Sequence, residues 1–223
     1  MLRPLLSALC LLALASQAQG QTTAATPDQL FSDFSRCDAR FFETLNTASL
    51  PAGTLRVAKQ GNVSAPVVMN PLQEGGRYQA FEQPLVVNGV RLLGYHNEAM
   101  SLPNVGNLLF WGFVAEGSVS DVAERLKPLI ADHARLVAER GNVSRADIRR
   151  VGDPIGQWRT EGLAGPGVAT PFGFVERTLS LEKGPTEGRT KDLLLLARHR
   201  HACPAASLSP RPQRQSAGLT KHA

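Results

Sequence analysis

Residues 78–97, YQAFEQPLVVNGVRLLGYHN, contain the pattern from which the fold is predicted. Two runs rich in apolar and aromatic residues, Tyr78–Val87 and Val90–Asn97, are separated only by the dipeptide Asn88-Gly89. A type I′ turn needs positive φ at both central positions, and Asn followed by Gly tolerates this best. The stretch therefore predicts a β-hairpin, and with it an antiparallel sheet.

Further strands are expected on both sides of this hairpin. The run Leu108–Ala115 begins LLFWGFV and is apolar on both faces, which is typical of a central strand or of a strand whose second face a partner covers. Weaker patterns predict strands at Val67–Met69, Ile148–Val151, Gln157–Thr160, Phe172–Leu181 and Asp192–Cys203. Loops rich in glycine and proline are expected at 162–171 and 184–188.

The sequence predicts two principal helices. The first has Thr26 as its N-cap and Pro27 in its first turn, continues with apolar residues every three or four positions, and ends within 46–51. Cys37 lies on its apolar stripe. The second is expected over Val119–Arg140, with a kink or break where Pro128 removes a backbone donor.

One octapeptide recurs in the chain. Residues 57–64, VAKQGNVS, return 80 positions later at 137–144 as VAERGNVS, and each copy follows a predicted helix. Two interpretations remain open: a duplication with units 26–116 and 118–203, or chance similarity around a shared helix stop. Tandem helix-then-sheet units are similar in layout to those of some inhibitor proteins, although no motif is shared.

The first 20 residues have the pattern of a signal peptide. Arg3 is followed by the apolar run Leu5–Ala15 and then by small residues with A-x-A-like patterns. The run is far shorter than the roughly 20 residues of a membrane span. We therefore expect an exported protein, periplasmic or secreted, rather than a retained anchor, and no later stretch predicts a membrane span.

Removal of this segment would also remove Cys10 and leave Cys37 and Cys203 in an oxidising compartment. Their disulfide would close a loop of about 166 residues and stabilise the fold by up to about 5 kcal/mol. The alternative is two separate buried thiols.

The positive charge of the chain is concentrated at its end. The net charge is +5, but without Arg3 and the cations after residue 197 the body carries about −1. Residues 204–223 are rich in Pro, Ser and Gln and predict a disordered basic tail. We therefore expect no nucleic-acid partner. The cations are Arg198, Arg200, Arg211, Arg214 and Lys221.

His199 and His201 alternate on a predicted strand and could serve a metal if a third ligand joined them. The candidates for that ligand are His96, Glu98 and His133. The alternative is a strand end where polar residues replace leucines as the strand leaves the core.

Four aromatic residues on or beside predicted strands are candidates for a binding surface on the sheet: Tyr95, Trp111, Phe113 and Trp158. If they face the helices instead, they belong to the core.

Together these patterns predict one α+β domain over 21–203, with a mainly antiparallel sheet of six to eight strands, two helices and one disulfide. No nucleophile elbow, phosphate loop or cofactor motif is found in the sequence. The expected function is an exported binding or inhibitor-type protein whose partner is another exported or envelope protein. A hydrolase or metal-dependent enzyme using His199 and His201, and a structural part of an envelope assembly, are the alternatives; the oligomeric state is left open.

Overall fold

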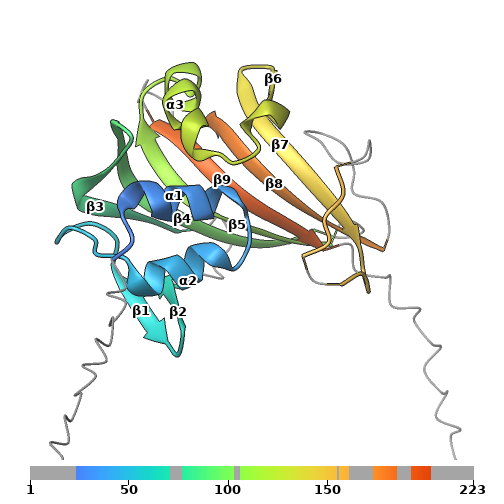
Figure 1. The fold of residues 1–223 in the computed structure, drawn as a ribbon, viewed down its shortest axis with the longest axis horizontal. Helices are drawn as coiled ribbons and strands as arrows, with labels where there is room; N and C mark the ends of the chain where they lie inside the picture. The colour runs from blue at the N-terminus through green and yellow to red at the C-terminus, as the bar shows by residue number, and fades with distance from the viewer. Residues whose placement is uncertain are drawn as a thin grey trace, which may run out of the picture.

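The computed structural model describes residues 24–70, 77–102, 106–154, 156–160, 173–184 and 192–201. Within these residues a seven-stranded sheet, ordered β3-β4-β5-β9-β8-β7-β6, forms the body, and β1 and β2 form a separate pair (Figure 1). All strand pairs are antiparallel, so the predicted α+β class is confirmed. The elements are α1 Pro27–Ser35, α2 Arg40–Thr47, β1 Val57–Gln60, β2 Val63–Pro66, β3 Arg77–Val87, β4 Val90–Leu102, β5 Gly106–Glu116, α3 Val119–Leu126, β6 Val137–Glu139, β7 Asn142–Arg150, β8 Phe174–Lys183 and β9 Asp192–His201.

The Asn88-Gly89 hairpin is confirmed. Val87 pairs with Val90, and the φ angles of Asn88 and Gly89 are 42° and 78°, as a type I′ turn requires. The strand β5 is flanked by β4 and β9, so it is an interior strand of the sheet, one of the two placements that its apolar sequence predicted. At the β5–β9 pair the first half of the sheet meets the second.

The core lies between the sheet and the helices, which cover one of its faces (Figure 1). Phe34 of α1, Phe41 of α2, Tyr95 of β4 and Phe113 of β5 form an aromatic cluster there. The rings of Phe34 and Phe113 are 5.1 Å apart, and those of Tyr95 and Phe113 are 5.6 Å apart, in edge-on arrangements. This cluster fixes α1 and α2 on the sheet.

The prediction of one uninterrupted first helix is wrong. Its start is as expected, because Thr26 Oγ1 accepts a hydrogen bond from Gln29 N at 3.2 Å. The helix ends at Ser35, however, and Cys37 takes a φ of 53°, which few residues other than glycine adopt. The helix α2 then begins at Arg40. The apolar spacing does not reveal this break because Phe34, Cys37 and Phe41 are buried on both sides of it.

The second helix is also shorter than predicted. The helix α3 starts with Ser118 Oγ accepting from Asp121 N, as expected, but it ends at Leu126, just before Pro128. Proline has no N–H for a further helical bond, so the predicted break is found and the helix does not resume. Residues 137–139 form the edge strand β6 instead.

The two copies of the octapeptide both form β-hairpins, but with different registers. In the first, Gln60 pairs with Val63 and the turn is Gly61-Asn62; in the second, Glu139 pairs with Asn142 and the turn is Arg140-Gly141. The turn has therefore moved by one residue between copies. The first hairpin stands alone, whereas the second is the edge of the main sheet. The duplication remains a prediction.

Three strand predictions need correction. Val67–Met69 follows β2 without belonging to a strand, and Gln157–Thr160 contributes only the single bridge between Arg159 and Ile148. The strand expected over Ile148–Val151 spans Asn142–Arg150 instead, so it starts earlier than predicted. The predicted loop at 162–171 and the tail at 204–223 lie outside the described residues.

Candidate functional site

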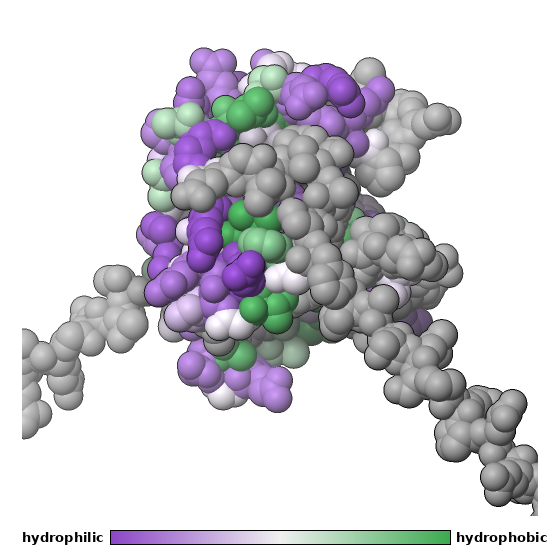
Figure 2. All heavy atoms as spheres, turned by 90° about the vertical axis from the view of Figure 1, so that its right-hand side faces the viewer, coloured by the Kyte–Doolittle hydropathy of each residue, from purple (hydrophilic) through white to green (hydrophobic). Residues whose placement is uncertain are grey.

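A cleft of about 700 Å³ opens between the α1–α2 junction, the segment that follows α3, and one face of β7 and β8. We call it the arginine cleft, because five arginines line it: Arg36, Arg40, Arg145, Arg149 and Arg177. The carboxylates of Asp38, Glu43 and Asp132 and the indole of Trp158 complete its charged and aromatic lining. Figure 2, viewed from the side on which β7 and β8 lie, shows hydrophilic side chains grouped around a smaller hydrophobic area.

The pleat of β7 places three charged residues on the face that forms the cleft. Arg145, Asp147 and Arg149 alternate along the strand, and side chains two residues apart share a face. Arg177 of β8 is the cross-strand partner of Asp147, so it joins the same group. Three of the five arginines, Arg145, Arg149 and Arg177, thus come from two neighbouring strands, whereas Arg36 and Arg40 come from the α1–α2 junction and the start of α2.

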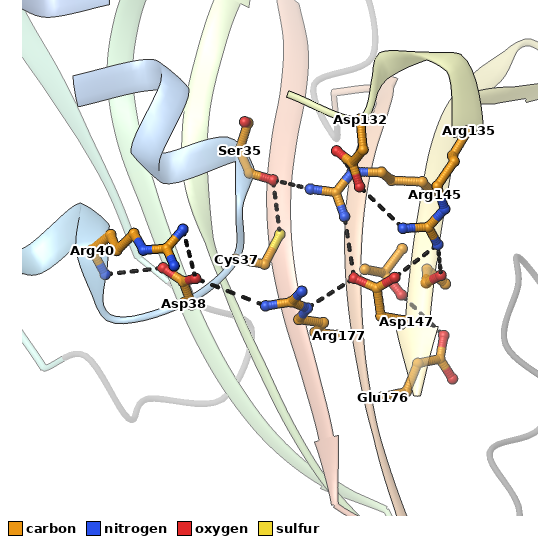
Figure 3. Close-up of polar contacts among 12 residues, drawn as sticks. Ser35, Cys37, Asp38, Arg40, Asp132, Arg135, Arg145, Asp147, Glu176 and Arg177 are labelled. Atoms are coloured by element: carbon orange, nitrogen blue, oxygen red, sulfur yellow. Dashed lines mark hydrogen bonds and ion pairs between the residues drawn. The ribbon is translucent and has the colours of Figure 1, made fainter. Parts of the chain in front are cut away.

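Asp147 is the centre of an ion-pair network (Figure 3). It is 1% exposed, and its Oδ1 lies 2.7 Å from Nη2 of Arg135. Its Oδ2 accepts from Nε of Arg177 at 2.9 Å and from Nη1 of Arg145 at 3.4 Å. Three guanidinium groups thus surround one buried carboxylate, and Asp132, which lies within ion-pair distance of both Arg135 and Arg145, offsets a second of their charges.

Arg145 connects this network to the helices. It is 4% exposed, and its Nη2 donates to the carbonyl oxygen of Ser35 at the end of α1. Its Nε lies 2.9 Å from Asp132 Oδ1, but the alignment is too poor for a hydrogen bond, so this buried donor has none in the described part of the chain. Nε of Arg36, which borders the same cleft, is likewise buried without one. Both Nε groups nevertheless lie beside a carboxylate, that of Arg145 beside Asp132 and that of Arg36 at 3.7 Å from Asp33.

Trp158 forms an aromatic wall of the cleft. Its neighbour Arg159 makes two backbone hydrogen bonds with Ile148 of β7, at 2.8 and 2.9 Å, which holds this segment against the strand. The guanidinium carbon of Arg177 lies 4.4 Å from the centre of the indole ring, and that of Arg149 lies 5.5 Å from it. Stacking on an aromatic face fixes a guanidinium in one orientation while leaving edges of its plane available.

The charges of the cleft do not balance. Its described lining has five arginines against three carboxylates, and adding Arg135 and Asp147 leaves this excess unchanged. Asp33, 3.7 Å from Arg36, offsets one charge. Arg149 donates to the carbonyl oxygen of Asp153 and has no ion pair among the described residues. A net positive charge therefore remains, and the site is suited to an anionic ligand.

The thiol of Cys37 lies beneath this cleft. It is buried, and its Sγ is 3.7 Å from the carbonyl oxygen of Ser35. Burial raises the pKa of the thiol to about 12, and the nearby charges of Arg145 and Arg177 only partly oppose this shift. As a thiol it would therefore be protonated at neutral pH and a poor nucleophile. Cys203, its predicted disulfide partner, lies outside the described residues.

The four aromatic candidates are in different environments. Tyr95 and Phe113 belong to the aromatic core beneath the helices. Trp111 is partly buried on the same side, with its ring 6.3 Å from that of Phe42. Trp158 alone of the four lines the arginine cleft. The sequence does not distinguish the core aromatics from Trp158 of the cleft, because all four residues lie on or beside predicted strands.

The candidate metal ligands do not form a three-ligand cluster where they are described. His96 Nε2 is 3.5 Å from Glu98 Oε2, whereas Nδ1 of His133 lies 3.1 Å from the carbonyl oxygen of Ile130 in the segment after α3. Within the described ranges, no group of three metal-binding side chains forms a site. The side chains of His199 and His201 lie outside the description; in the strand register these residues pair with Leu109 and Asn107 of β5.

The arginines of the cleft were not predicted. The segment RADIRR, residues 145–150, alternates charged and apolar residues, which is the signal that could have revealed them. The helix predicted over Val119–Arg140 reaches close to this segment, and the strand was therefore predicted to begin only at Ile148. No described helix is long and apolar enough to cross a membrane.

No protein-family model matches the chain, and neither a curated protein nor a solved structure matches it significantly.

Proposed function

We propose that the chain is an exported binding protein of the inhibitor type, and that it holds an anionic group of its partner in the arginine cleft. The observation that carries this proposal is the excess of guanidinium groups over carboxylates in a partly buried cleft beside Trp158. Arginine and tryptophan are the side chains most enriched among residues that dominate binding energies at protein interfaces.

The chemistry of the cleft supports binding rather than proton transfer. Guanidinium groups stay protonated at all physiological pH values, so they recognise anions but do not act as acids or bases. The carboxylates of Asp132 and Asp147 are each within ion-pair distance of two or more arginines. What the described cleft offers a partner is therefore charge, hydrogen-bond donors and an aromatic surface.

Export is part of the same proposal and is inferred from the signal-peptide pattern of residues 1–20. The Cys37–Cys203 disulfide is proposed only for the exported protein, because disulfides persist in oxidising compartments. The N-terminal sequence of the protein recovered from the native organism would begin near residue 21 if the signal is cleaved. Its mass before and after reduction and alkylation would show whether the two cysteines are joined. An uncleaved N-terminus would contradict export, and two alkylated cysteines without reduction would contradict the disulfide.

The binding site is tested by affinity capture with matched baits. Wild-type mature protein, Arg177→Met, Trp158→Ala and Arg91→Met are each incubated with the envelope fraction. Arg91 is the control, because it is an exposed arginine on β4 whose guanidinium pairs with Glu116 at 2.9 Å, away from the cleft. A partner kept by wild type and Arg91→Met but lost by both cleft variants supports the proposal. A partner kept equally by all four baits would refute the assignment of the cleft.

A further inference from the structure

Asp38 has an unusual position in the arginine cleft. Its Oδ2 lies 3.9 Å from Nη1 of Arg40 and 3.9 Å from Nη1 of Arg177, so the carboxylate sits between two guanidinium groups (Figure 3). Both distances exceed the 2.7–3.2 Å of a hydrogen bond, which marks the contacts as weak. The other oxygen, Oδ1, accepts from the backbone N–H of Arg40 at 3.0 Å. This local bond holds the carboxylate back from the two arginines.

The arginine on the sheet side is already oriented. Arg177 donates from Nε to Asp147 at 2.9 Å and stacks on Trp158, so its plane is fixed from two directions. Arg40 faces it from the start of α2, with a side chain 55% exposed. With Arg177 already oriented and Arg40 at the rim of the cleft, the two guanidinium groups can bind a planar anion between them with good geometry.

We propose that this position is a carboxylate subsite, in which a carboxylate of the partner binds between Arg40 and Arg177 and displaces the side chain of Asp38. The inference rests on the proposed function and adds the ligand class to it. The carboxylate of Asp38, which now occupies the position, is itself a planar monoanion. A guanidinium group can bind a carboxylate through two parallel hydrogen bonds. The indole of Trp158, which packs on Arg177, places an aromatic surface beside the subsite.

The test uses benzoate, whose ring and carboxylate match the two features of the subsite, with benzenesulfonate as the non-carboxylate counterpart. Binding to the mature full-length protein is followed by calorimetric or NMR titration. Asp38→Asn removes the internal competitor but keeps an oxygen for the Arg40 N–H, so benzoate should bind at least about threefold more tightly. Arg40→Met should weaken benzoate binding by a similar factor, because it removes one side of the subsite.

Glu43→Gln is the matched control for charge. Glu43 is an exposed residue of α2 that lines the same cleft but forms no ion pair with Arg40 or Arg177, so its variant makes the same change in net charge without removing the carboxylate between them. An equal gain in Asp38→Asn and Glu43→Gln would overturn the subsite, as would equal binding of benzenesulfonate. If cleft variants still lose the captured partner in that case, the proposed function stands without the subsite.

The source of the carboxylate is distinguished with a second probe. A short peptide with one glutamate, an acetylated N-terminus and an amidated C-terminus presents only a side-chain carboxylate. Tighter binding of the peptide than of benzoate, sensitive to Asp38→Asn, assigns the carboxylate to a protein partner. Tighter binding of benzoate assigns it to a free organic acid, and binding of neither probe overturns the inference.

Discussion

Arg145 donates a hydrogen bond to the carbonyl oxygen of Ser35, a residue 110 positions earlier in the chain. Ser35 ends α1 and Arg145 belongs to β7, so this contact joins the first helix to the second half of the sheet. The carbonyl groups at a helix C-terminus lack helical partners, and a cation there is favourable. The same arginine therefore both stabilises the end of α1 and forms part of the arginine cleft.

Arg145→Met should destabilise the protein by about 2–4 kcal/mol, because it leaves a buried carboxylate and a helix-terminal carbonyl with fewer partners. The free energy of unfolding is measured by urea denaturation. Arg149→Met is the control, because Arg149 lies on the same strand face but has no described ion pair. Its cost should be below about 1 kcal/mol. A smaller loss for Arg145→Met than for Arg149→Met would contradict the role given to the buried network.

Cys37 gives a second prediction, made in a Cys203→Ser variant so that the proposed disulfide cannot form. The pKa of the buried thiol rises from 9.0 to about 12, so the folded state binds the thiol proton more tightly than the unfolded state. This contribution to stability is complete below pH 9 and is lost as the pH rises from 9 towards 12. A native thiol at pH 8 should react slowly with a disulfide reagent and quickly in urea.

Cys37→Ala in the same Cys203→Ser background is the control. It should lose the part of the alkaline destabilisation that comes from the thiol. If the two variants show the same decline of unfolding free energy above pH 9, the thiol is not the group responsible. Rapid modification of Cys37 in the native protein would show that it is not buried in solution.

The fold class was predictable because it depends on local signals. The Asn88-Gly89 turn, the two-sided apolar run in β5 and the Thr26 cap are each decided by a few neighbouring residues. The break at Cys37 was not, because a positive φ in a non-glycine residue is stabilised by contacts with distant segments. The same limit applies to the cleft, which arises only when β7, β8 and the α1–α2 junction meet.

Tyr95 allows a third prediction. Burial raises the pKa of its phenol well above the ordinary value, despite a hydrogen bond with Asn97 that lowers it. The chain has only two tyrosines, and Tyr78 is half exposed, with its hydroxyl donating to the Leu93 carbonyl. In an alkaline titration followed by absorbance near 295 nm, the Tyr95 signal should appear only as the protein unfolds. Tyr95→Phe should abolish that late step. Ionisation of Tyr95 in the wild-type protein before it unfolds would contradict the burial of this residue.

The last prediction uses the shifted turn of the octapeptide. In the second copy Arg140 has a φ of 51° and precedes Gly141, so a non-glycine side chain occupies the first central position of a type I′ turn. Asparagine is preferred there, and Arg140→Asn should stabilise the protein by about 0.5–1 kcal/mol, measured by urea denaturation. Gln60 is the aligned residue of the first copy, but it is the last residue of β1 and does not have a positive φ. Gln60→Asn should therefore bring no gain, and an equal gain in both variants would mean that the two hairpins share one register.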